Sequence, residues 1–581
     1  MKLRLYTPGI AVIAALLLLA SCSSKKNIQG KRVPKDAGFV LHFNSKSMFE
    51  KLNVADLKQT DWYRQMVEQL EQDSTTPDFV KNLHENMGSS GVDSAADVIF
   101  FGQKDPKNQM NVVLEGGIMD AKAFESFATK MYPQGNIIKA GEIQTMVLMD
   151  HAVLTWNKDR FVMGMIPHQR ANRHELPNNS DDSTGTTRIN GIEDLTAYCK
   201  NLYSLREDNS LGSDEKFSDL MSTGGDIHVW ISVENLLGGD DLPLGALNMI
   251  KLDAFTKGTI ATFTANFENG RISVKTKCYF GKELSDIFKK YSGGNFNTDM
   301  IKNIPSQNVV AVLALHFKPE GLRAMVDLSG VGAIIDLILL RQGFSVDDFV
   351  KANKGDLLVA FTDLQKTQQP DTSSGHQADI SIPSEKTVRD NLDAKVLFSA
   401  AINDKEAFNK LINVGKTSIG TNDKLHYKSN GNYFVIGNDS NVVDQYLAGG
   451  KDDQPFLNQI SGSSVGGFAD IQKILRALPP DAVKDSLIRQ MSDESLKMWD
   501  NAVLTGGNYS NGGFNLQLEL NLSDKNTNSL RQLLQYTMVM SRLERKKIKD
   551  MEPGKKLFAV NTDTTTTFNE LHRTPIGKKK K

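Results

Sequence analysis

Cysteine is scarce in this chain of 581 residues, which contains only three, at positions 22, 199 and 278. A chain of this length with so few cysteines is not a small disulfide scaffold, and no cysteine and histidine pair has zinc-site spacing. An excess of one charge is also lacking, because 68 Lys and Arg stand against 69 Asp and Glu, for a net charge of −1. This balance removes the basic surface that neutralises phosphates, so no nucleic-acid partner is expected.

Long apolar runs are lacking except at the start of the chain. Lys2 and Arg4 precede the apolar stretch Ile10–Leu19, which is the layout of an export signal. The run closes as Leu19-Ala20-Ser21-Cys22, which resembles a bacterial lipobox, where the chain is cut before the cysteine and the cysteine is acylated. We therefore predict a signal peptide over residues 1–21, a lipidated Cys22 that anchors the protein to a membrane, and a polar tether over residues 22–32. The alternative is a plain secretory signal with an incidental cysteine.

Sequence blocks recur in the same order in the two halves of the chain. This indicates an internal duplication with a period too long for a solenoid. We predict a first repeat domain over residues 33–295 and a second over residues 296–541. Three of the matched pairs are VPKDAGFVLHF (33–43) with IPSQNVVAVLALHF (304–317), GIMDAKAFESF (117–127) with AINDKEAFNKL (401–411), and NFENGRISV (266–274) with NYSNGGFNL (508–516).

The matched blocks predict secondary structure by their local chemistry. Asn269-Gly270 and Asn511-Gly512 each stand between alternating apolar residues and predict type I′ hairpin turns. Asp120 and Asp404 precede helical patterns and are expected to be helix N-caps rather than catalytic acids. Consecutive strands joined by short turns indicate antiparallel sheet. The predicted fold is α+β, with two tandem homologous domains, each a mainly antiparallel sheet with packed helices, after the signal peptide.

The last forty residues differ in charge from the rest. Residues 542–581 hold 12 Lys and Arg against 5 Asp and Glu, a net charge of +7. Removing this +7 and the +2 of residues 1–21 from the overall −1 leaves −10 on residues 22–541. The pattern predicts an acidic body followed by a basic, disordered tail.

The lipobox, the stretch VPKDAGFVLHFNSKSM (33–48), the helix start MDAKAF (119–124) and the duplicated layout together resemble a known family. This family, domain-of-unknown-function family 4836, consists of envelope lipoproteins of gut anaerobes. The resemblance implies a lipoprotein fold and carries no activity or site residues. Lipoproteins sent to the cell surface in that lineage often have an acidic cluster after the cysteine, whereas Lys25 and Lys26 stand here. This favours the periplasmic side of the outer membrane.

The motifs that usually accompany catalysis are weak. Gly462-Ser463-Ser464-Val465-Gly466 fits the spelling of a nucleophile elbow, but a loop precedes it and a strand follows, so Ser464 is expected to be structural. His168 and His174 lie beside a polar insertion and are not expected to bind metal. We predict no catalytic, cofactor or metal residues. His42 and His316 occupy equivalent repeat positions on strands and are expected to pack there with backbone partners.

Several other residues are expected to serve packing. Cys278 falls in the apolar set of an alternating strand and Cys199 in a helical segment, so each is interpreted as a small buried hydrophobe, with a disulfide between them left open. Trp62 and Tyr63 are expected to anchor a core, although an exposed sugar platform stays open. The run AIIDLILL (333–340) predicts a core helix that is too short to span a membrane.

These observations favour a non-catalytic binding or scaffolding module, anchored through Cys22 in the bacterial envelope, with an envelope protein or glycan as its partner. A duplicated chain is expected to offer a cleft between its halves. Two alternatives stay open. One is a hydrolase of envelope or dietary polymers that uses a carboxylate pair, because such pairs can be invisible in sequence. The other is a glycan or peptide receptor on the cell surface.

Overall fold

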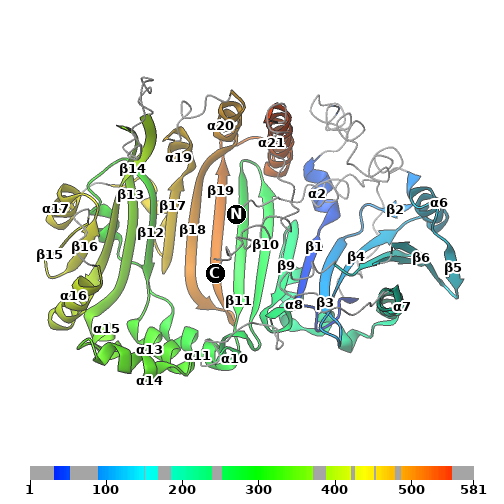
Figure 1. Ribbon diagram of the computed structural model, residues 1–581, viewed down its shortest axis with the longest axis horizontal. Helices are drawn as coiled ribbons and strands as arrows, with labels where there is room; N and C mark the ends of the chain where they lie inside the picture. The colour runs from blue at the N-terminus through cyan, green and yellow to red at the C-terminus, as the bar shows by residue number, and fades with distance from the viewer. Residues whose placement is uncertain are drawn as a thin grey trace, which may run out of the picture.

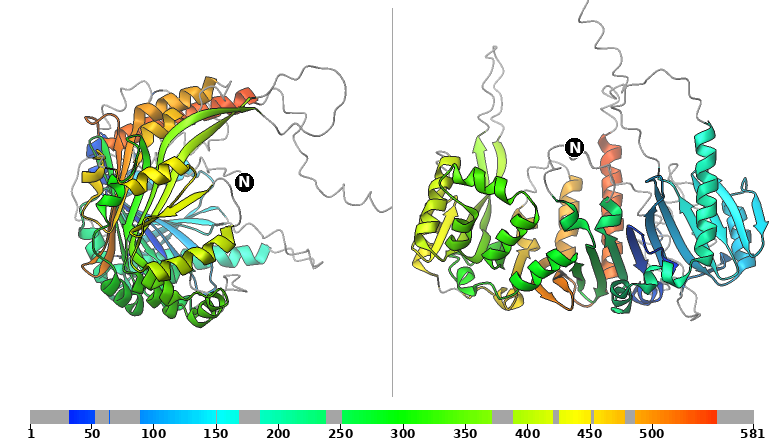
Figure 2. Two further views of the ribbon diagram at one scale, coloured as in Figure 1. Left: turned by 90° about the vertical axis from the view of Figure 1, so that its left-hand side faces the viewer. Right: turned by 90° about the horizontal axis from the view of Figure 1, so that it is seen from below.

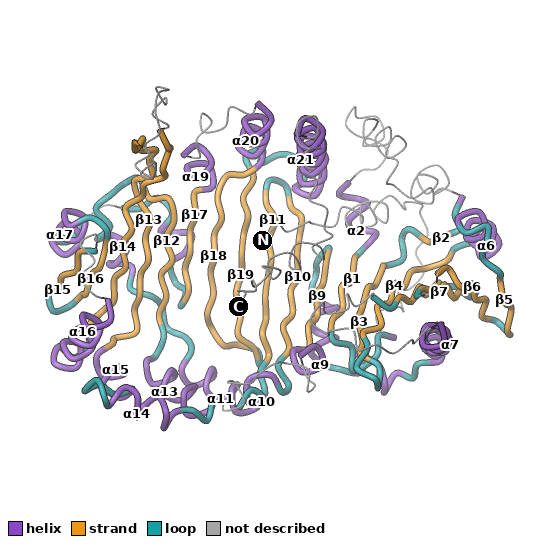
Figure 3. The backbone as a smooth tube through the Cα atoms, viewed as in Figure 1, coloured by secondary structure: helices purple, strands orange, loops and turns teal. Residues whose placement is uncertain are grey.

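One antiparallel sheet runs through the whole described part of the chain (Figure 1). The structure is a computed structural model. It describes residues 32–52, 64, 89–149, 151–167, 185–237, 251–370, 388–419, 425–450, 453–477 and 486–551. Strands occupy the middle of the molecule and helices lie on both faces and along the edges (Figure 3). The predicted α+β class is confirmed.

The elements of the first half alternate strands and helices. They are β1 (Phe39–Phe43), α2 (Ser45–Leu52), β2 (Val92–Asp93), β3 (Val98–Lys104), β4 (Met110–Ile118), α6 (Ala121–Met131), β5 (Ile137–Ala140), β6 (Ile143–Met149), β7 (Ala152–Trp156), β8 (Arg160–Met165), α7 (Gly185–Asn201), the 3-10 helices η3 (Leu202–Ser204), η4 (Glu207–Asn209) and η5 (Leu211–Ser213), α8 (Glu215–Ser222), β9 (Ile227–Ser232), α9 (Val233–Leu237), α10 (Asp253–Thr256), β10 (Ile260–Glu268), β11 (Arg271–Tyr279) and α11 (Lys282–Tyr291).

The second half follows a similar course with more helices. Its elements are α12 (Thr298–Lys302), β12 (Val309–His316), α13 (Pro319–Leu328), α14 (Gly332–Leu340), α15 (Val346–Ala352), β13 (Asn353–Pro370), β14 (Val388–Ile402), α16 (Lys405–Ile419), β15 (His426–Ser429), β16 (Tyr433–Gly437), α17 (Ser440–Ala448), α18 (Leu457–Ile460), β17 (Val465–Asp470), α19 (Ile471–Ala477), α20 (Ser486–Met498), β18 (Trp499–Ser510), β19 (Gly513–Leu522) and α21 (Ser529–Met551).

Strand pairing joins the two halves into one sheet. From one side to the other the order is β5-β6-β7-β8-β4-β3-β1-β9-β10-β11 and then β19-β18-β17-β12-β13-β14-β16-β15, with the short β2 also paired to β4. The junction is the β11–β19 ladder, in which Arg271 pairs with Asn521 and Cys278 with Phe514.

Counted outward from this junction, the pairings of the two halves correspond. β11, β10, β9, β1, β3, β4 and β8 on one side match β19, β18, β17, β12, β13, β14 and β16 on the other. A tandem duplication would produce this arrangement, and the duplication itself stays a prediction. The halves do not form two separate sheets, because β11 and β19 hydrogen-bond to each other.

The sheet is curved (Figure 2), and two apolar cores lie on its inner face. In the first half, α7 and α8 cover one core. Leu195 of α7 and Phe217 of α8 pack there with Phe101 and Trp230 of the sheet. In the second half, α12, α17 and α18 cover a larger core, in which Tyr446 is fully buried. The strands at the junction lie between these two helical covers.

The outer face is packed by other helices. α6 covers β4 and β8, where Phe124 stacks on Phe161 with ring centroids 5.4 Å apart. Near the junction, α2 contributes Met48 and α21 contributes Leu530 to one cluster over Phe267. Helices from the beginning and the end of the chain thus close the same core.

Most local signals in the sequence form the elements that they predict. Asp120 Oδ1 accepts hydrogen bonds from Lys122 N and Ala123 N at the start of α6, and Asp404 Oδ1 accepts one from Ala407 N at the start of α16. Both residues are therefore N-caps, as predicted. α21 runs to Met551, past the boundary expected at 541.

The two Asn-Gly turns close hairpins, but only one turn has the predicted geometry. Asn511 and Gly512 both have positive φ, 49° and 77°, as a type I′ turn requires. In the first hairpin only Gly270 has a positive φ, so the type I′ prediction was wrong there. The reason is an additional pairing, because Asn269 bridges to Asn528 and Gly270 N donates to Thr527 O.

The apolar run 333–340 forms helix α14, but its prediction as a core helix was wrong. Ile334, Leu337, Ile338 and Leu340 are all exposed. The helix lies beyond the ends of the strands and packs against α13 and α15 only along one side. A short apolar run has no signal that tells an inward-facing helix from an edge helix.

Candidate functional site

The inner face of the sheet is hollowed at the junction of the two halves. The cavity has a volume of about 350 Å³ and draws on β10 and β11 from the first half and on β18 and β19 from the second. Helix α8 forms one wall. Most residues that line it have polar side chains, namely Asp219, Thr223, Thr262, Thr264, Lys275, Thr276, Lys277, Thr505, Asn515 and Gln517, and Leu220 and Leu516 add apolar surface. We call this cavity the junction groove. A hollow between the halves is what the repeated sequence predicts.

Strand alternation explains why these polar groups gather. Alternate residues of a strand point to the same face, and residues paired across a ladder share that face. Thr262 pairs with Lys277, and Lys277 pairs in turn with Asn515 on β19. One row further along, Thr264 pairs with Lys275. The polar positions of two hairpins from opposite halves thereby form one continuous surface.

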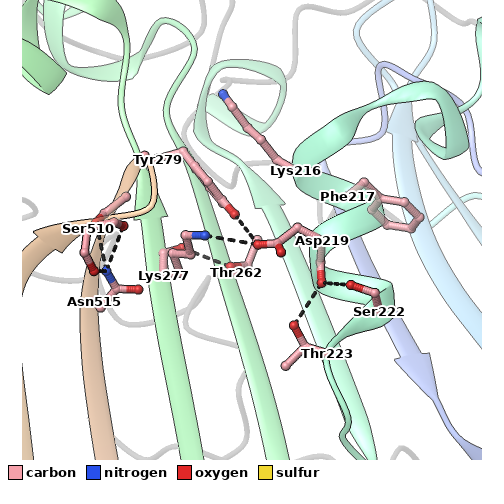
Figure 4. Close-up of polar contacts among 12 residues, drawn as sticks. Lys216, Phe217, Asp219, Ser222, Thr223, Thr262, Lys277, Tyr279, Ser510 and Asn515 are labelled. Carbon is pink, nitrogen blue, oxygen red and sulfur yellow. Dashed lines mark hydrogen bonds and ion pairs between the residues drawn. The ribbon is translucent and has the colours of Figure 1, made fainter.

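One ion pair closes the wall of the junction groove at α8 (Figure 4). Lys277 Nζ donates to Asp219 Oδ2 at 3.0 Å, and Tyr279 OH donates to the same oxygen at 2.9 Å. Lys277 Nζ also lies 4.8 Å from the centre of the Tyr279 ring, and Lys216 Nζ lies 5.3 Å from it. Tyr279 is therefore enclosed by two ammonium groups, which favour the electron-rich ring face.

These contacts fix the charges of the wall. The hydrogen bonds from Lys277 and Tyr279 hold the pKa of the Asp219 carboxyl below its ordinary value. Burial acts to lower the pKa of Lys277, but its hydrogen bonds to Tyr279 and Asp219 outweigh burial and raise it. At neutral pH both partners are charged, so Asp219 holds no proton to donate. Lys275, one row away, is exposed.

A second polar cluster continues the inner face beyond the groove. Arg271 contacts the carboxylates of Glu268 and Glu519, the latter at 3.3 Å. Gln517 Nε2 donates to Glu519 Oε1 at 2.7 Å. This cluster joins β10, β11 and β19, so it ties both halves together at the end of the groove.

The arrangement suits binding by hydrogen bonds more than acid–base chemistry. The junction groove holds a single carboxylate, Asp219. A second cavity, of about 500 Å³, lies beside η4. Its lining includes Tyr198, Asn201 and Asn209, and Asp36 is its single carboxylate. Neither lining holds the two carboxylates of a glycosidase, although Glu519 stands beside the junction groove through its hydrogen bond with Gln517. Among the described residues, no three His, Cys, Asp or Glu side chains are grouped as a metal site would need.

His42 and His316, the equivalent histidines, lie outside the junction groove. His42 is buried between His228, whose Nδ1 is 3.1 Å from its own Nδ1, and Asp97, whose Oδ2 is 2.6 Å from its Nε2. His316 Nδ1 lies 2.9 Å from Asp356 Oδ1. Both histidines are on strands, as expected, but their ring partners are side chains rather than the expected backbone groups.

Ser464 is structural, as expected, although it stands near a histidine and an aspartate. His316 N donates to Ser464 O at 2.6 Å, which places the two residues side by side on β12 and at the start of β17. The buried Ser464 hydroxyl, however, lies 2.7 Å from Gly294 O and 2.8 Å from Asn508 Oδ1. With its Oγ held by these two oxygens and shielded from solvent, Ser464 does not have the exposed position of an elbow nucleophile.

Cys199 and Cys278 are not joined by a disulfide. Cys199 lies on α7 and is fully buried, and burial raises the pKa of its thiol to about 12. Cys278 is half-buried, and burial raises its pKa as well. Both are small packed side chains, as interpreted from the sequence. The lipidation residue Cys22, the aromatic pair Trp62 and Tyr63, and the histidines His168 and His174 lie outside the described residues.

Sequence reasoning missed every residue of the junction groove. Thr262, Lys275, Lys277 and Gln517 occupy the polar positions of ordinary alternating strands. The same alternation occurs wherever one face of a sheet meets water. The available signal was the pair of Asn-Gly hairpins, since matching hairpins in a duplicated chain can meet at its centre.

The fold and the groove define an α+β protein with one curved antiparallel sheet and a polar hollow at its centre. The chain belongs to the DUF4836 family, a domain of unknown function, whose model matches residues 30–420. The matched segment begins before β1 and ends after α16. No helix in the described part of the chain is long and apolar enough to cross a membrane.

Two solved structures are similar to part of the chain. The structure of crystal form III of TP0453 has 9% sequence identity and a TM-score of 0.24, and the match covers 45% of this chain and 82% of that chain. The structure of crystal form IV of TP0453 has 8% identity and a TM-score of 0.24, with 43% and 80% covered. No curated protein matches the sequence.

Proposed function

We propose that this protein is a lipid-anchored binding module of the bacterial envelope, held at the periplasmic side of the outer membrane through Cys22, and that the junction groove binds its ligand. The observation that carries the proposal is the continuous row of hydroxyl, amide and ammonium groups contributed by both halves. A groove between two halves of one chain is a common place for a ligand. Its role is recognition and not catalysis.

The groove lining favours a hydroxyl-rich ligand, such as an envelope glycan. Thr264, Thr505 and Gln517 can each donate and accept hydrogen bonds, as sugar hydroxyls do. Lys275 adds one exposed positive charge for an acidic substituent. The ion pair of Asp219 with Lys277 leaves the wall nearly neutral, which suits a polymer with few charges.

Binding can be tested on the mature chain without its lipid, residues 23–581, by calorimetric titration with oligosaccharides released from the native envelope. The double variant Lys275→Ala/Gln517→Ala should weaken binding by about tenfold or more, because each lost hydrogen bond contributes about 0.5–1.5 kcal/mol. The matched control, Lys122→Ala/Gln445→Ala, changes an exposed lysine on α6 and an exposed glutamine on α17. Equal affinity of the groove variant and the wild type would reject the groove, and no binding by the wild type would reject the glycan.

The anchor has its own test. Cells grown with a labelled fatty acid should incorporate the label into the wild type and into Cys278→Ala, but not into Cys22→Ala, which should leave the membrane fraction. Label retained in Cys22→Ala would contradict the anchor. Protease treatment of intact cells then separates the membrane faces. Survival of the protein supports the periplasmic side, and its loss supports a surface receptor.

The hydrolase alternative has less support. A glycosidase needs a carboxylic acid whose pKa is raised, together with a second carboxylate about 5–10 Å away. Asp219 has the opposite shift and is the single carboxylate of its cavity. Release of reducing ends from envelope polymers by the wild type, and loss of that activity in Asp219→Asn, would revive this alternative.

A further inference from the structure

Helix α14 presents an uncovered aliphatic surface. The exposed fractions are 38% for Ile334, 55% for Leu337, 55% for Ile338 and 62% for Leu340, and Leu322 of the neighbouring α13 adds 38%. Positions 334, 337 and 338 are spaced by three and four residues, so they share one side of the helix. Scattered exposed apolar residues are normal, but a contiguous helical patch of this kind marks an interaction site.

The acidic residue of α14 is turned away from this patch. Asp336 accepts a hydrogen bond from Arg323 Nη1 on α13 at 3.0 Å, and Arg323 also pairs with Asp327 at 3.1 Å. This ion pair holds α14 against α13 and keeps the Asp336 carboxylate out of the exposed aliphatic row, while the exposed Asp327 and Asp347 also pair with Arg323. Arg341, directly after the helix, is exposed and adds a positive charge at the end of the patch.

The patch lies on the same edge of the molecule as the beginning of the described chain. Asn235 of α9 donates to Ala37 O just before β1, α9 contacts α10, and Lys251 N before α10 donates to Ser329 O just before α14. α10, α11, α13 and α14 form one row along the lower edge in Figure 1. The ten residues 23–32 can span at most about 35 Å, so a lipid on Cys22 would be within about 35 Å of this edge.

We propose that the α14 patch (Leu322, Ile334, Leu337, Ile338 and Leu340) docks on the lipid surface that holds the acylated Cys22. Aliphatic side chains with a cation at the border are the composition of helices that lie in a membrane interface, whereas protein interfaces are enriched in aromatic residues. A tether this short keeps the edge at the bilayer. The acylated Cys22 leaves the protein free to rotate about its tether, so α14 supplies a second contact that sets the orientation. The inference rests on the proposed membrane anchor at Cys22.

The test uses the mature chain without lipid, residues 23–581, floated with vesicles of phosphatidylethanolamine and phosphatidylglycerol. The wild type should float with the vesicles. The affinity of Leu337→Ser/Ile338→Ser for the vesicles should fall by at least about tenfold, because each side chain loses apolar contact with the bilayer. The control Ile138→Ser/Val147→Ser removes two exposed apolar residues, 57% and 42% exposed, on the distant β5–β6 hairpin and should float like the wild type. Because all four residues are exposed, unchanged urea unfolding should accompany every variant.

A second readout places α14 directly. Leu337→Trp should shift its fluorescence to the blue on vesicle addition and be quenched by brominated lipid. No flotation of the wild type, or equal flotation of the α14 variant, would overturn the proposal. A concentration-dependent dimer that the α14 variant loses, with flotation unchanged, would assign the patch to a second copy instead. Loss of fatty-acid label at Cys22 is measured separately, so failure of the anchor and failure of α14 docking give different results.

Discussion

At the scale of single residues, the buried ion pair between β4 and β8 shows how the first half is held together. Arg160 Nη1 donates to Glu115 Oε1 at 2.6 Å, and Nη2 donates to Leu202 O at 2.7 Å. The guanidinium also lies over the Tyr203 ring, 4.6 Å from its centre. Burial raises the pKa of Glu115, and the charge of Arg160 acts against that rise. Each charge therefore depends on its partner.

Removing one partner should be severe. We expect Arg160→Ala to lower the free energy of unfolding by about 3–5 kcal/mol, because it leaves the Glu115 carboxylate buried without a counter-charge. Arg206→Ala breaks the exposed pair with Asp208 and should change it by less than about 1 kcal/mol. Urea unfolding of the two variants measures both. A small effect of Arg160→Ala would mean that water reaches the site.

His228 should make stability depend on pH. Its Nε2 lies 2.7 Å from Thr223 O, and the titratable side chains near it are those of His42, Asp97 and Asp226. Burial holds the pKa of His228 below its ordinary value, although the hydrogen bond to Thr223 O acts in the other direction. The unfolded chain therefore binds the proton first as pH falls below about 6.5, and this contribution to stability is lost in that range.

We expect the wild type to need less urea to unfold at about pH 5.5 than at about pH 7.5. His228→Gln should show a shallower change, since it removes the titrating group, while His426→Gln on the edge strand β15 should keep the wild-type slope. Equal slopes for the wild type and His228→Gln would assign the pH dependence to carboxylates instead.

At the scale of elements, the two central hairpins are a matched pair that differ in their surroundings. A Cβ on Gly512 would meet no atom within 4 Å, whereas a Cβ on Gly270 would lie 2.5 Å from Lys525 Cα. Both glycines have positive φ. Gly512→Ala should therefore cost about 1–2 kcal/mol through backbone strain alone.

Gly270→Ala should cost at least about 1 kcal/mol more than Gly512→Ala, because the segment before α21 must also move. Thermal unfolding of both variants gives the comparison. Equal losses would show that the contact of Gly270 with Lys525 yields without cost. Hydrogen exchange in residues 523–528 should rise in Gly270→Ala only, which ties the loss to that contact.

The same elements show which parts of the fold the sequence predicts. Asp120, Asp404 and the pair Asn511-Gly512 act within a few residues, so local chemistry was enough to place them. The predicted type I′ turn at Asn269 was wrong because Asn269 pairs with Asn528, which is far along the chain. The residues of the junction groove were not predicted for a similar reason. Lys275 and Gln517 pair across the two halves, and each alone is an ordinary surface residue. Helix α14 was placed correctly, but its exposure depends on where the sheet ends.

At the scale of the whole molecule, the halves are bound by one ladder and one shared core. Eight residue pairs join β11 to β19, from Arg271 with Asn521 to Cys278 with Phe514. Behind this ladder, α21 from the second half packs Leu530 against Phe267 of the first. Separating the halves would leave two long strand edges unpaired, which favours aggregation over folding of either half.

We therefore expect the two halves to unfold together rather than as two separate domains. Trp156 and Trp230 lie in cores of the first half, whereas Trp499 of β18 packs in the core that both halves share. Their fluorescence and the hydrogen exchange of β11 and β19 should change at one urea concentration.

Leu518→Pro removes an N–H from the middle of β19 and should lower stability by about 3 kcal/mol or more, whereas Lys139→Pro on the edge strand β5 should have a smaller effect. If the first half instead unfolded before β19 lost protection, each half would be a separate folding unit, and the junction groove would open without global unfolding. A single transition means that a ligand spanning the groove stabilises both halves at once, because its binding site exists only while the β11–β19 ladder is intact.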